Sequence, residues 1–329
     1  MSDGLQEIGD PTAWDQALQA FDFVPPGQTS AWSHSPQFRG HDMLRLVSPK
    51  PGAVAVQGIL KRSMGVARLI VNDGPLLGKA CDEETWLAFV EALKERIGKT
   101  SLVSFASMQP YDPVHEVWLR RAGFQRPWSS NASPLTLYVN CAKKAALDAD
   151  FSRDWRKNIR KGEKKGLVFE AVGLADAQAR ADFLRLYFET FSIKGIDANI
   201  DTPMLEGLGA DPRWFAFFSA EAGKRLSARL VFVSGAYAFD FAAGTSAEGR
   251  KLSSSHFLAA CVLRHLGDAG VAEFDFGRVG PGRYDSIDHF KYGSGGRPVS
   301  YLGEWSSSSR PWLELAIAAA GFLKRSERW

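Results

Sequence analysis

Residues 243–277 read AGTSAEGRKLSSSHFLAACVLRHLGDAGVAEFDFG, which combines a polar turn, a helical segment and a strand. Three strand-like runs come shortly before it: WFAFFSAE, RLSARLVFVS and GAYAFDFAAG. Short apolar runs separated by glycine and polar residues indicate antiparallel hairpins. The pattern then predicts a helix over 252–269 and a strand at EFDFG. An antiparallel meander followed by a helix and a further strand is an α+β pattern.

The first part of the chain has a similar order of elements. Its strand-like runs are MLRLVS, GAVAVQGILKR and GVARLIV. A helix over 82–97, the strand SLVSFAS, a helix over 113–122 and the strand SPLTLYV follow. The likeness lies in the order of elements and not in the residues. We therefore predict two similar α+β domains, 1–145 and 146–329, each with a mainly antiparallel sheet flanked by helices.

The composition is that of a globular protein with a substantial core, because 45% of the 329 residues are hydrophobic and 23% are charged. A net charge of +3 argues against general coating of nucleic acid, so any such contact must be local. The acidic N-terminus does not resemble a signal peptide, and the longest apolar stretch, WLELAIAAAGFL, is too short to span a bilayer. We expect a cytoplasmic protein without an integral membrane segment.

Several kinds of chemistry lack their usual sequence signals. The three cysteines are widely separated, and the six histidines show no ligand spacing. No G-x-x-x-x-G-K-[ST], G-x-G-x-x-G or G-x-S-x-G sequence occurs, and no cysteine has a catalytic signature around it. We therefore expect no disulfide, no metal, no cofactor and no covalent nucleophile.

Residues 151–166, FSRDWRKNIRKGEKKG, carry a local charge of +5, because the stretch contains seven Lys or Arg residues and only two acidic residues, Asp154 and Glu163. Trp155 and Ile159 lie four residues apart, so they share a helical face that is expected to pack on the core. Two further stripes consist of cations only: Arg156, Arg160 and Lys164, and Lys157, Lys161 and Lys165. A solvated amphipathic helix usually mixes both signs, whereas successive phosphates would attract such a face. We predict phosphate contacts for Arg156, Arg160 and Lys164.

The turn before the helix at 252–269 is a second candidate site. Backbone N–H groups at a helix start attract anions, and the serines there can cap the helix. Arg250 and Ser253 are therefore candidate phosphate-binding residues. An ordinary helix cap is the alternative interpretation.

A third candidate follows the strand that ends near Asp275. The stretch GRVGPGRYDSIDHFKYGSGG is rich in glycine and predicts a long loop, in which Lys291 lies on a turn. Polar loops at strand ends commonly carry function, which makes Arg283, Tyr284 and Lys291 candidates. An ordinary solvated surface loop remains the alternative.

Taken together, these stretches resemble the Fem family of aminoacyl-tRNA-dependent peptidyltransferases and the related Fem-like acyltransferases. The resemblance rests on WRKNIRKGEKKGL, on the stretch from GTSAEGRK to EFDFG, and on DHFKYGSG, with weaker echoes in QTSAW, VNDGPLLG and LRRAGFQ. It implies two GNAT-like domains, with the active site between them or in the second. It also implies a reaction-centre role for Lys291, which stands at the position of a family lysine.

The chain departs from the family in three respects. Cell-wall members have a lysine shortly after their QS..W motif that contacts the nucleotide-sugar peptide acceptor, whereas Ser33, His34, Ser35 and Pro36 follow Trp32 here. No long heptad region indicates a coiled-coil arm. The R/Q-x-x-G-x-G loop of acetyl-CoA enzymes is also missing from both halves. The resemblance therefore does not specify the acceptor.

The resemblance implies an aminoacyltransferase that joins an amino acid from aminoacyl-tRNA to an amine on a peptide or small molecule. Lys291 would stabilise developing negative charge, and Asp240 or Asp275 would orient the amine and accept its proton. One alternative is an N- or O-acyltransferase that uses acyl-CoA in polysaccharide or natural-product assembly, with CoA phosphates at the helix start over 249–255. Another is a tRNA-binding or scaffolding protein without catalysis.

Overall fold

The structure is a computed structural model of the chain and describes residues 4–127, 133–194, 198–280, 285–310 and 312–313. These residues form two compact units. The first unit contains the described residues up to Ser33, those from Gly40 to Pro134 and those from Ser300 onward. The second unit contains His34–Arg39 and Leu135–Val299.

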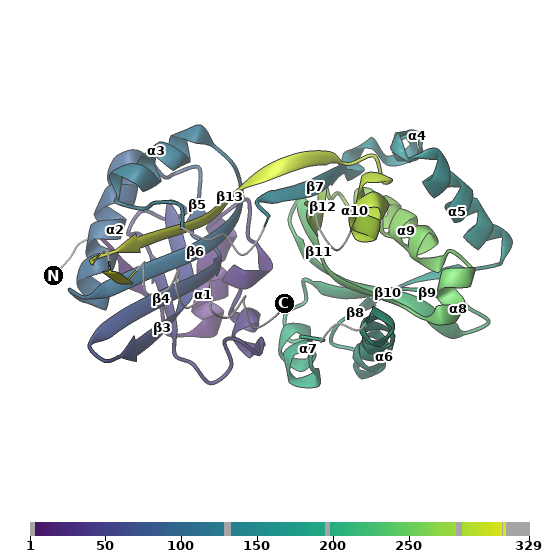
Figure 1. Cartoon of the computed structure of the whole chain (residues 1–329), viewed down its shortest axis with the longest axis horizontal. Helices are drawn as coiled ribbons and strands as arrows, with labels where there is room; N and C mark the ends of the chain where they lie inside the picture. The colour runs from purple at the N-terminus through teal and green to yellow at the C-terminus, as the bar shows by residue number, and fades with distance from the viewer. Residues whose placement is uncertain (1–3, 128–132, 195–197, 281–284, 311, 314–329) are drawn as a thin grey trace. The chain divides into compact units, whose positions relative to one another are not determined.

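The sheet of the first unit has the strand order β1-β2-β3-β4-β6-β13, with β5 paired to β3 (Figure 1). The elements are β1 (Gln6–Glu7), α1 (Pro11–Ala17), η1 (Leu18–Ala20), η2 (Pro26–Gln28), η3 (Ser30–His34), β2 (Met43–Val47), β3 (Val54–Ser63), β4 (Val66–Asp73), β5 (Leu76–Leu77), α2 (Glu83–Ile97), β6 (Ser101–Pro110), α3 (Pro113–Arg121) and β13 (Arg297–Ser308).

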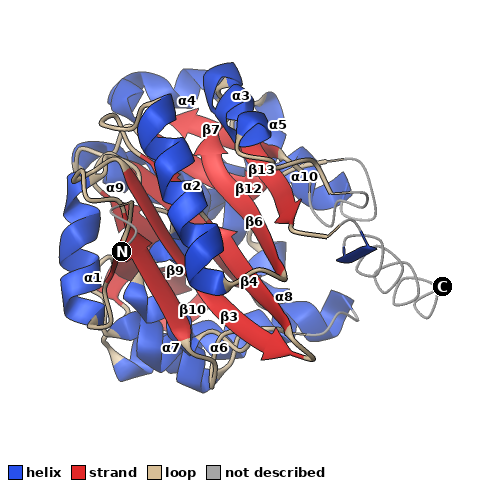
Figure 2. Ribbon diagram, turned by 90° about the vertical axis from the view of Figure 1, so that its left-hand side faces the viewer, coloured by secondary structure: helices blue, strands red, loops and turns tan. Residues whose placement is uncertain are grey.

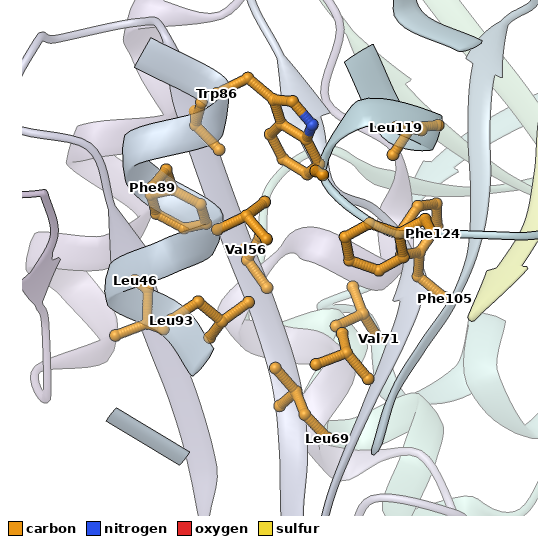
Figure 3. Packing of buried hydrophobic residues seen from close by; sticks show 14 of the residues in the cluster. Leu46, Val56, Leu69, Val71, Trp86, Phe89, Leu93, Phe105, Leu119 and Phe124 are labelled. Atoms are coloured by element: carbon orange, nitrogen blue, oxygen red, sulfur yellow. The ribbon is translucent and has the colours of Figure 1, made fainter. Parts of the chain in front are cut away.

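Helices α2 and α3 cover one face of this sheet, and Figure 2 shows α2 lying across its strands. Asp82 begins α2 by accepting the Thr85 amide, and Lys94 and Arg96 occupy the last turn. The core between helix and sheet is built from large side chains that alternate along the strands (Figure 3). Its labelled members are Leu46, Val56, Leu69, Val71, Trp86, Phe89, Leu93, Phe105, Leu119 and Phe124.

A buried glutamine closes the end of this sheet. The side-chain amide of Gln28 donates to the Asn72 carbonyl at 2.6 Å and accepts from the Gln57 amide at 2.8 Å. A Cβ on Gly74 would lie 2.6 Å from Gln28 Cδ, so only glycine fits there. The QTSAW and VNDGPLLG motifs thus meet in space, through hydrogen bonds between the Gln28 side chain and the backbone of β3 and β4.

The sheet of the second unit has the strand order β7-β12-β11-β10-β9-β8 (Figure 1). The elements are β7 (Leu135–Asn140), η4 (Cys141–Ala146), α4 (Leu147–Asp150), α5 (Arg153–Lys164), β8 (Val168–Gly173), α6 (Ala177–Lys194), α7 (Thr202–Gly209), β9 (Trp214–Glu221), β10 (Lys224–Ser234), β11 (Tyr237–Thr245), α8 (Ala247–Lys251), α9 (Ser254–Asp268), β12 (Glu273–Arg278) and α10 (Asp285–Tyr292).

Helices α5 and α9 lie against one face of this sheet, and α6 covers the opposite face (Figure 1). Trp155 and Ile159 of α5 are 2% and 4% exposed, which confirms the predicted packing face. The His34–Arg39 segment belongs to this unit because it docks on α7, where Arg39 pairs with Asp201 at 2.8 Å.

The order of elements predicted for each half is present in each unit: an antiparallel meander, a helix and a fourth strand. The fourth strand is parallel to its neighbour in both units, as β4·β6 and β11·β12. All other strand pairs within the two units as described are antiparallel. Mainly antiparallel α+β sheets are therefore confirmed.

Two predictions need correction. The boundary at residue 145 differs from the observed division, because β7 pairs with β12 of the second unit while Ser300–Ser308 returns to pair with β6 of the first. Lys291 lies on helix α10 and not on a turn. Phe290 lies on the apolar side of α10, and the centroid of its ring is 4.9 Å from that of Trp155 on α5.

No helix in the described part of the chain combines the length and the apolar character needed to cross a membrane.

Candidate functional site

The parallel strands β11 and β12 part after three residue pairs. Their register joins Tyr237 to Glu273 and ends with Phe239 opposite Asp275. Strand β11 continues to Thr245, paired with β10 on its other side, and its register with β10 shifts by one residue between Asp240 and Ala242. We call the point after Phe239 and Asp275 the strand split. Ligands in open sheets commonly bind beyond the carboxyl ends of parallel strands, so the strand split is the first place to look for a site.

Asp240 is the first residue of β11 beyond the strand split. One carboxylate oxygen, Oδ2, pairs with the guanidinium of Arg229 on β10, and the two side chains are 8% and 6% exposed. The other oxygen, Oδ1, is buried and has no hydrogen-bond partner among the described residues. Burial raises the pKa of Asp240, while the cations of Arg229 and Lys291 act in the opposite direction. A buried carboxylate with one free oxygen can bind and deprotonate an N–H or O–H donor.

Lys291 reaches the strand split from α10. Its ammonium donates to the carbonyl of Arg278 at 2.7 Å. A Cβ on Gly277 would lie 3.9 Å from Lys291 Nζ and 3.7 Å from the Asp240 carbonyl oxygen, so both residues border the same glycine. Burial lowers the pKa of Lys291, and the carboxylates of Asp240, Asp288 and Asp275 oppose that change. The structure thus brings Lys291 and Asp240, two predicted catalytic residues, together.

Asp275 belongs to the same region but points to the other face of the sheet. It is fully buried, and its carboxylate accepts hydrogen bonds from the hydroxyls of Thr136 and Tyr237. It also accepts the amide of Gly277 at 2.7 Å, and Gly277 has φ of 74°. This arrangement shapes the chain that presents the Arg278 carbonyl to Lys291. Asp275 therefore supports the site and has its oxygens occupied.

Helix α5 anchors α10. The Trp155 indole donates to the Phe290 carbonyl at 2.8 Å, and the Ser152 amide donates to the Gly293 carbonyl at 2.9 Å. A Cβ on Gly293 would lie 2.3 Å from Trp155 Cδ1, so glycine is required for this close approach. The inner face of the basic helix therefore holds the element that carries Lys291.

The outer face of α5 is exposed and cationic. Arg156, Arg160 and Lys164 are exposed, and none has an ion-pair partner within the described chain. The same holds for Lys157, Lys161 and Lys165. These six residues, which we call the cationic face, are free to meet an external anion.

The remaining predicted residues lie on α8, at the start of α9 or outside the described residues. Ser253 adopts a left-handed conformation with φ of 60°, and its hydroxyl donates to Asn158 of α5 at 3.1 Å. Arg250 is exposed on α8. Among the described residues, no hydrogen bond or ion pair joins Ser253 or Arg250 to Lys291 or Asp240. Arg283 and Tyr284 lie outside the described residues.

Two residues of this site were not predicted from the sequence. Arg229 lies in the apolar run SARLVFV. A buried arginine needs a carboxylate partner, so an arginine at this position of a strand is a sequence signal for a buried ion pair. His256 of α9 packs its ring 4.9 Å from Phe290 and 5.5 Å from Trp155. Burial, assisted by the Arg229 charge, lowers the pKa of His256 to about 4. Nothing in the local sequence around His256 indicated this position.

The cysteines offer no ready nucleophile. Burial raises the pKa of Cys81 and Cys141 to about 12 and that of Cys261 to about 11, which suppresses the thiolate.

Comparisons with known proteins identify the fold. Residues 149–292 match the family model of the acetyltransferase (GNAT) domain. The FemX structure aligns with a TM-score of 0.79 at 14% identity, over 94% of this chain and 99% of FemX. L-PGS from Bacillus licheniformis aligns with a TM-score of 0.66 at 12% identity, over 94% of this chain and 96% of its own. No curated protein matches the sequence significantly.

A tandem GNAT protein from the clavulanic acid biosynthesis pathway also aligns, with a TM-score of 0.52 at 14% identity over 93% of this chain and 98% of its own. At such identities these likenesses establish the fold. The chain consists of two GNAT-like domains, and the predicted resemblance to Fem-like GNAT-fold proteins is confirmed. The matched GNAT region contains the strand split, Asp240 and Lys291.

Proposed function

We propose that this protein is an acyltransferase that forms an amide, with an aminoacyl-tRNA as donor and an amine on a peptide or small molecule as acceptor. The observation that carries the proposal is the proximity of the Lys291 ammonium and Asp240 at Gly277, together with an Asp240 carboxylate oxygen that has no hydrogen-bond partner among the described residues. An ammonium and a free carboxylate are what ester aminolysis needs, namely charge stabilisation and a proton acceptor.

The reaction is an attack by the acceptor nitrogen on the ester carbonyl carbon. Asp240 Oδ1 accepts a proton from the nitrogen, a C–N bond forms, and negative charge develops on the carbonyl oxygen. The Lys291 ammonium stabilises that charge. The C–O bond to the ribose then breaks, and the ribose oxygen takes up the proton that Asp240 accepted. The ester is already activated, so positioning and electrostatics account for most of the catalysis.

The cationic face supports an RNA-linked donor. Six exposed cations on one helix, without ion pairs in the described chain, provide a surface for phosphates without reading sequence. The helix also anchors α10 through Trp155, so a donor bound along α5 would be close to the element that carries Lys291. The resemblance of the sequence to the Fem family also implies an aminoacyl-tRNA donor, and FemX shares this fold.

The second candidate is an N- or O-acyltransferase that uses acyl-CoA. The match of residues 149–292 to an acetyltransferase domain model favours it. In this case the CoA phosphates would bind where α8 meets α9, near Arg250 and Ser253.

A donor panel separates the two candidates. Purified protein would receive radiolabelled aminoacyl-tRNAs and labelled acetyl-CoA in parallel, each with a mixture of amines, peptides and amino sugars. The proposal expects an amide product from aminoacyl-tRNA that ribonuclease pretreatment abolishes. Lys291→Met and Asp240→Asn should each lose this product, whereas Lys61→Gln, an exposed residue of the first unit, should retain it. A product from acetyl-CoA alone would replace the first candidate by the second. An aminoacyl-tRNA donor would place the reaction in the cytoplasm.

A further inference from the structure

Arg229 is the residue through which Asp240 and α10 are connected. Its guanidinium pairs with Asp240 Oδ2 and lies over the rings of Phe276 and Phe290, at 5.4 and 5.2 Å from their centroids. Phe290 directly precedes Lys291 in the chain. One buried side chain therefore contacts the carboxylate on β11, the strand β12 and the helix that carries the ammonium.

We propose that Arg229 is a positioning residue for amide formation: it holds Asp240 by Oδ2 so that Oδ1 faces the acceptor amine. The inference rests on the proposed function. Arginine suits the role because its planar fork binds a carboxylate while its face stacks on aromatic rings, which lysine does not do equally well. The rotamer of Asp240 is thereby restricted on one side, and the unpartnered oxygen is left on the other.

Energetics support a role beyond stability. A buried ion pair seldom stabilises a fold more than well-packed apolar side chains of the same volume would. Arg229 and Asp240 nevertheless interrupt an otherwise apolar region of β10 and β11, with one carboxylate oxygen left unsatisfied. Such an arrangement is expected where a site needs a charge and not where a core needs packing.

Several charged or titratable groups surround the pair. They are Lys291, Asp288 and His289 on α10, His256 on α9, Asp275 on β12 and Asp154 on α5. The cations that favour the ionised form of Asp240 are Arg229 itself and Lys291. Removal of the Arg229 charge should therefore raise the pKa of Asp240 further.

The same strand supplies a matched control. Arg225 of β10 lies over the Phe218 ring at 4.1 Å and pairs with Glu170 at 2.9 Å and Asp182 at 3.1 Å. Its side chain is 17% exposed. Arg225→Met thus removes an arginine with the same kinds of contacts, but away from the strand split.

The first measurement needs no substrate. Protein labelled with ¹³Cγ-aspartate would be titrated by NMR, with the Asp240 signal assigned by its loss in Asp240→Asn. Arg229→Met should raise the pKa of Asp240, Arg229→Lys should change it less, and Arg225→Met should leave it unchanged. An unchanged Asp240 pKa in folded Arg229→Met, or an equal shift in Arg225→Met, would overturn the inference.

The second measurement is aminoacyl transfer. Arg229→Met should lower kcat about 10- to 100-fold with little change in KM and move the acidic limb of the pH profile to higher pH. Arg229→Lys should restore part of kcat, and Arg225→Met should remain within about threefold of wild type. A shifted Asp240 pKa with an unchanged kcat and pH profile would refute positioning. If Arg229→Met raises the pKa of Asp240 but the wild-type protein transfers no amino acid, the proposed function is refuted and the electrostatic coupling of Arg229 to Asp240 still stands.

Discussion

Neutralising the cationic face should weaken tRNA binding without weakening the fold. The perturbation is Arg156→Gln with Arg160→Gln, two exposed arginines that lie one helical turn apart on α5. Four residues of α-helix advance about 6 Å, so the pair can meet two neighbouring phosphates. Because neither arginine has an ion-pair partner in the described chain, their loss should change the free energy of unfolding by less than about 0.5 kcal/mol.

The expected magnitude follows from counterion release. Each phosphate contact contributes about 0.7 to 0.9 to the slope of log K against log salt concentration. Losing two contacts should therefore reduce the slope for tRNA by about 1.4 to 1.8. Fluorescence anisotropy with a labelled tRNA at several salt concentrations measures this slope directly. No knowledge of the acceptor is needed.

The control removes the same net charge elsewhere. Lys61 and Lys99 are exposed lysines of the first unit, and Lys61→Gln with Lys99→Gln also lowers the net charge by two. This double variant should keep the wild-type slope within about 0.3 if the contacts are local. Equal slopes in the two double variants, or a melting temperature that collapses in Arg156→Gln/Arg160→Gln alone, would refute the reasoning and assign α5 a structural role.

Three further outcomes are expected. Lys291→Met should lower the single-turnover rate of transfer on the order of 10²-fold, the scale of a lost oxyanion donor, and a rate within threefold of wild type would remove Lys291 from the reaction. Activity should depend on pH with a bell shape. It should fall at low pH as Asp240 is protonated, with a pKa above the ordinary carboxyl range, and at high pH as Lys291 loses its proton, with a pKa below the ordinary lysine range. An active Lys291→Arg variant whose alkaline limb is unshifted would contradict the assignment of that limb to Lys291. The lowered pKa of His256 means that the unfolded chain binds its proton more tightly. The free energy of unfolding should therefore fall by roughly 2 to 3 kcal/mol from pH 6.5 to 4. When urea unfolding is compared at both pH values, His256→Gln should remove this loss and His41→Gln should not.

Most elements of the fold could be predicted because their signals are local. Helix α2 begins one residue after its capping Asp82, as the sequence pattern indicates, and β9 coincides with the run WFAFFSAE. The assignment of strands to domains could not be predicted in the same way. Leu135–Asn140 and Ser300–Ser308 each have suitable β patterns for either sheet, and only long-range pairing decides which sheet each one joins.

The candidate site was predictable only in part, since its geometry depends on which face of the sheet each side chain occupies. Alternation along β11 and β12 gives no reason to prefer Asp240 over Asp275 until the neighbouring strands are known. Packing places Asp275 against Thr136 and Tyr237, whereas Asp240 faces Arg229 and the helices. The position of Lys291 after a strand end makes it a candidate, whereas its reaction-centre role comes from a resemblance, and the glycines on both sides of α10 favour a loop over the observed helix.

The same order of elements gives a continuous parallel strand pair in the first unit and a parting strand pair with a candidate site in the second. In the first unit β4 and β6 remain paired from Ala67 to Asp73, and Gln28 satisfies the backbone at the end of β4. In the second unit the equivalent parallel pair parts after Phe239 and Asp275, and Asp240 Oδ1 just beyond that point has no hydrogen-bond partner among the described residues. The polar groups at the two places differ accordingly. In the first unit the neutral amide of Gln28 bonds to the backbone, whereas in the second unit the charged side chains of Arg229 and Asp240 leave Asp240 Oδ1 without a hydrogen-bond partner among the described residues. This contrast supports placing the chemistry in the second unit, where a buried carboxylate oxygen of Asp240 can still accept a hydrogen bond from a ligand.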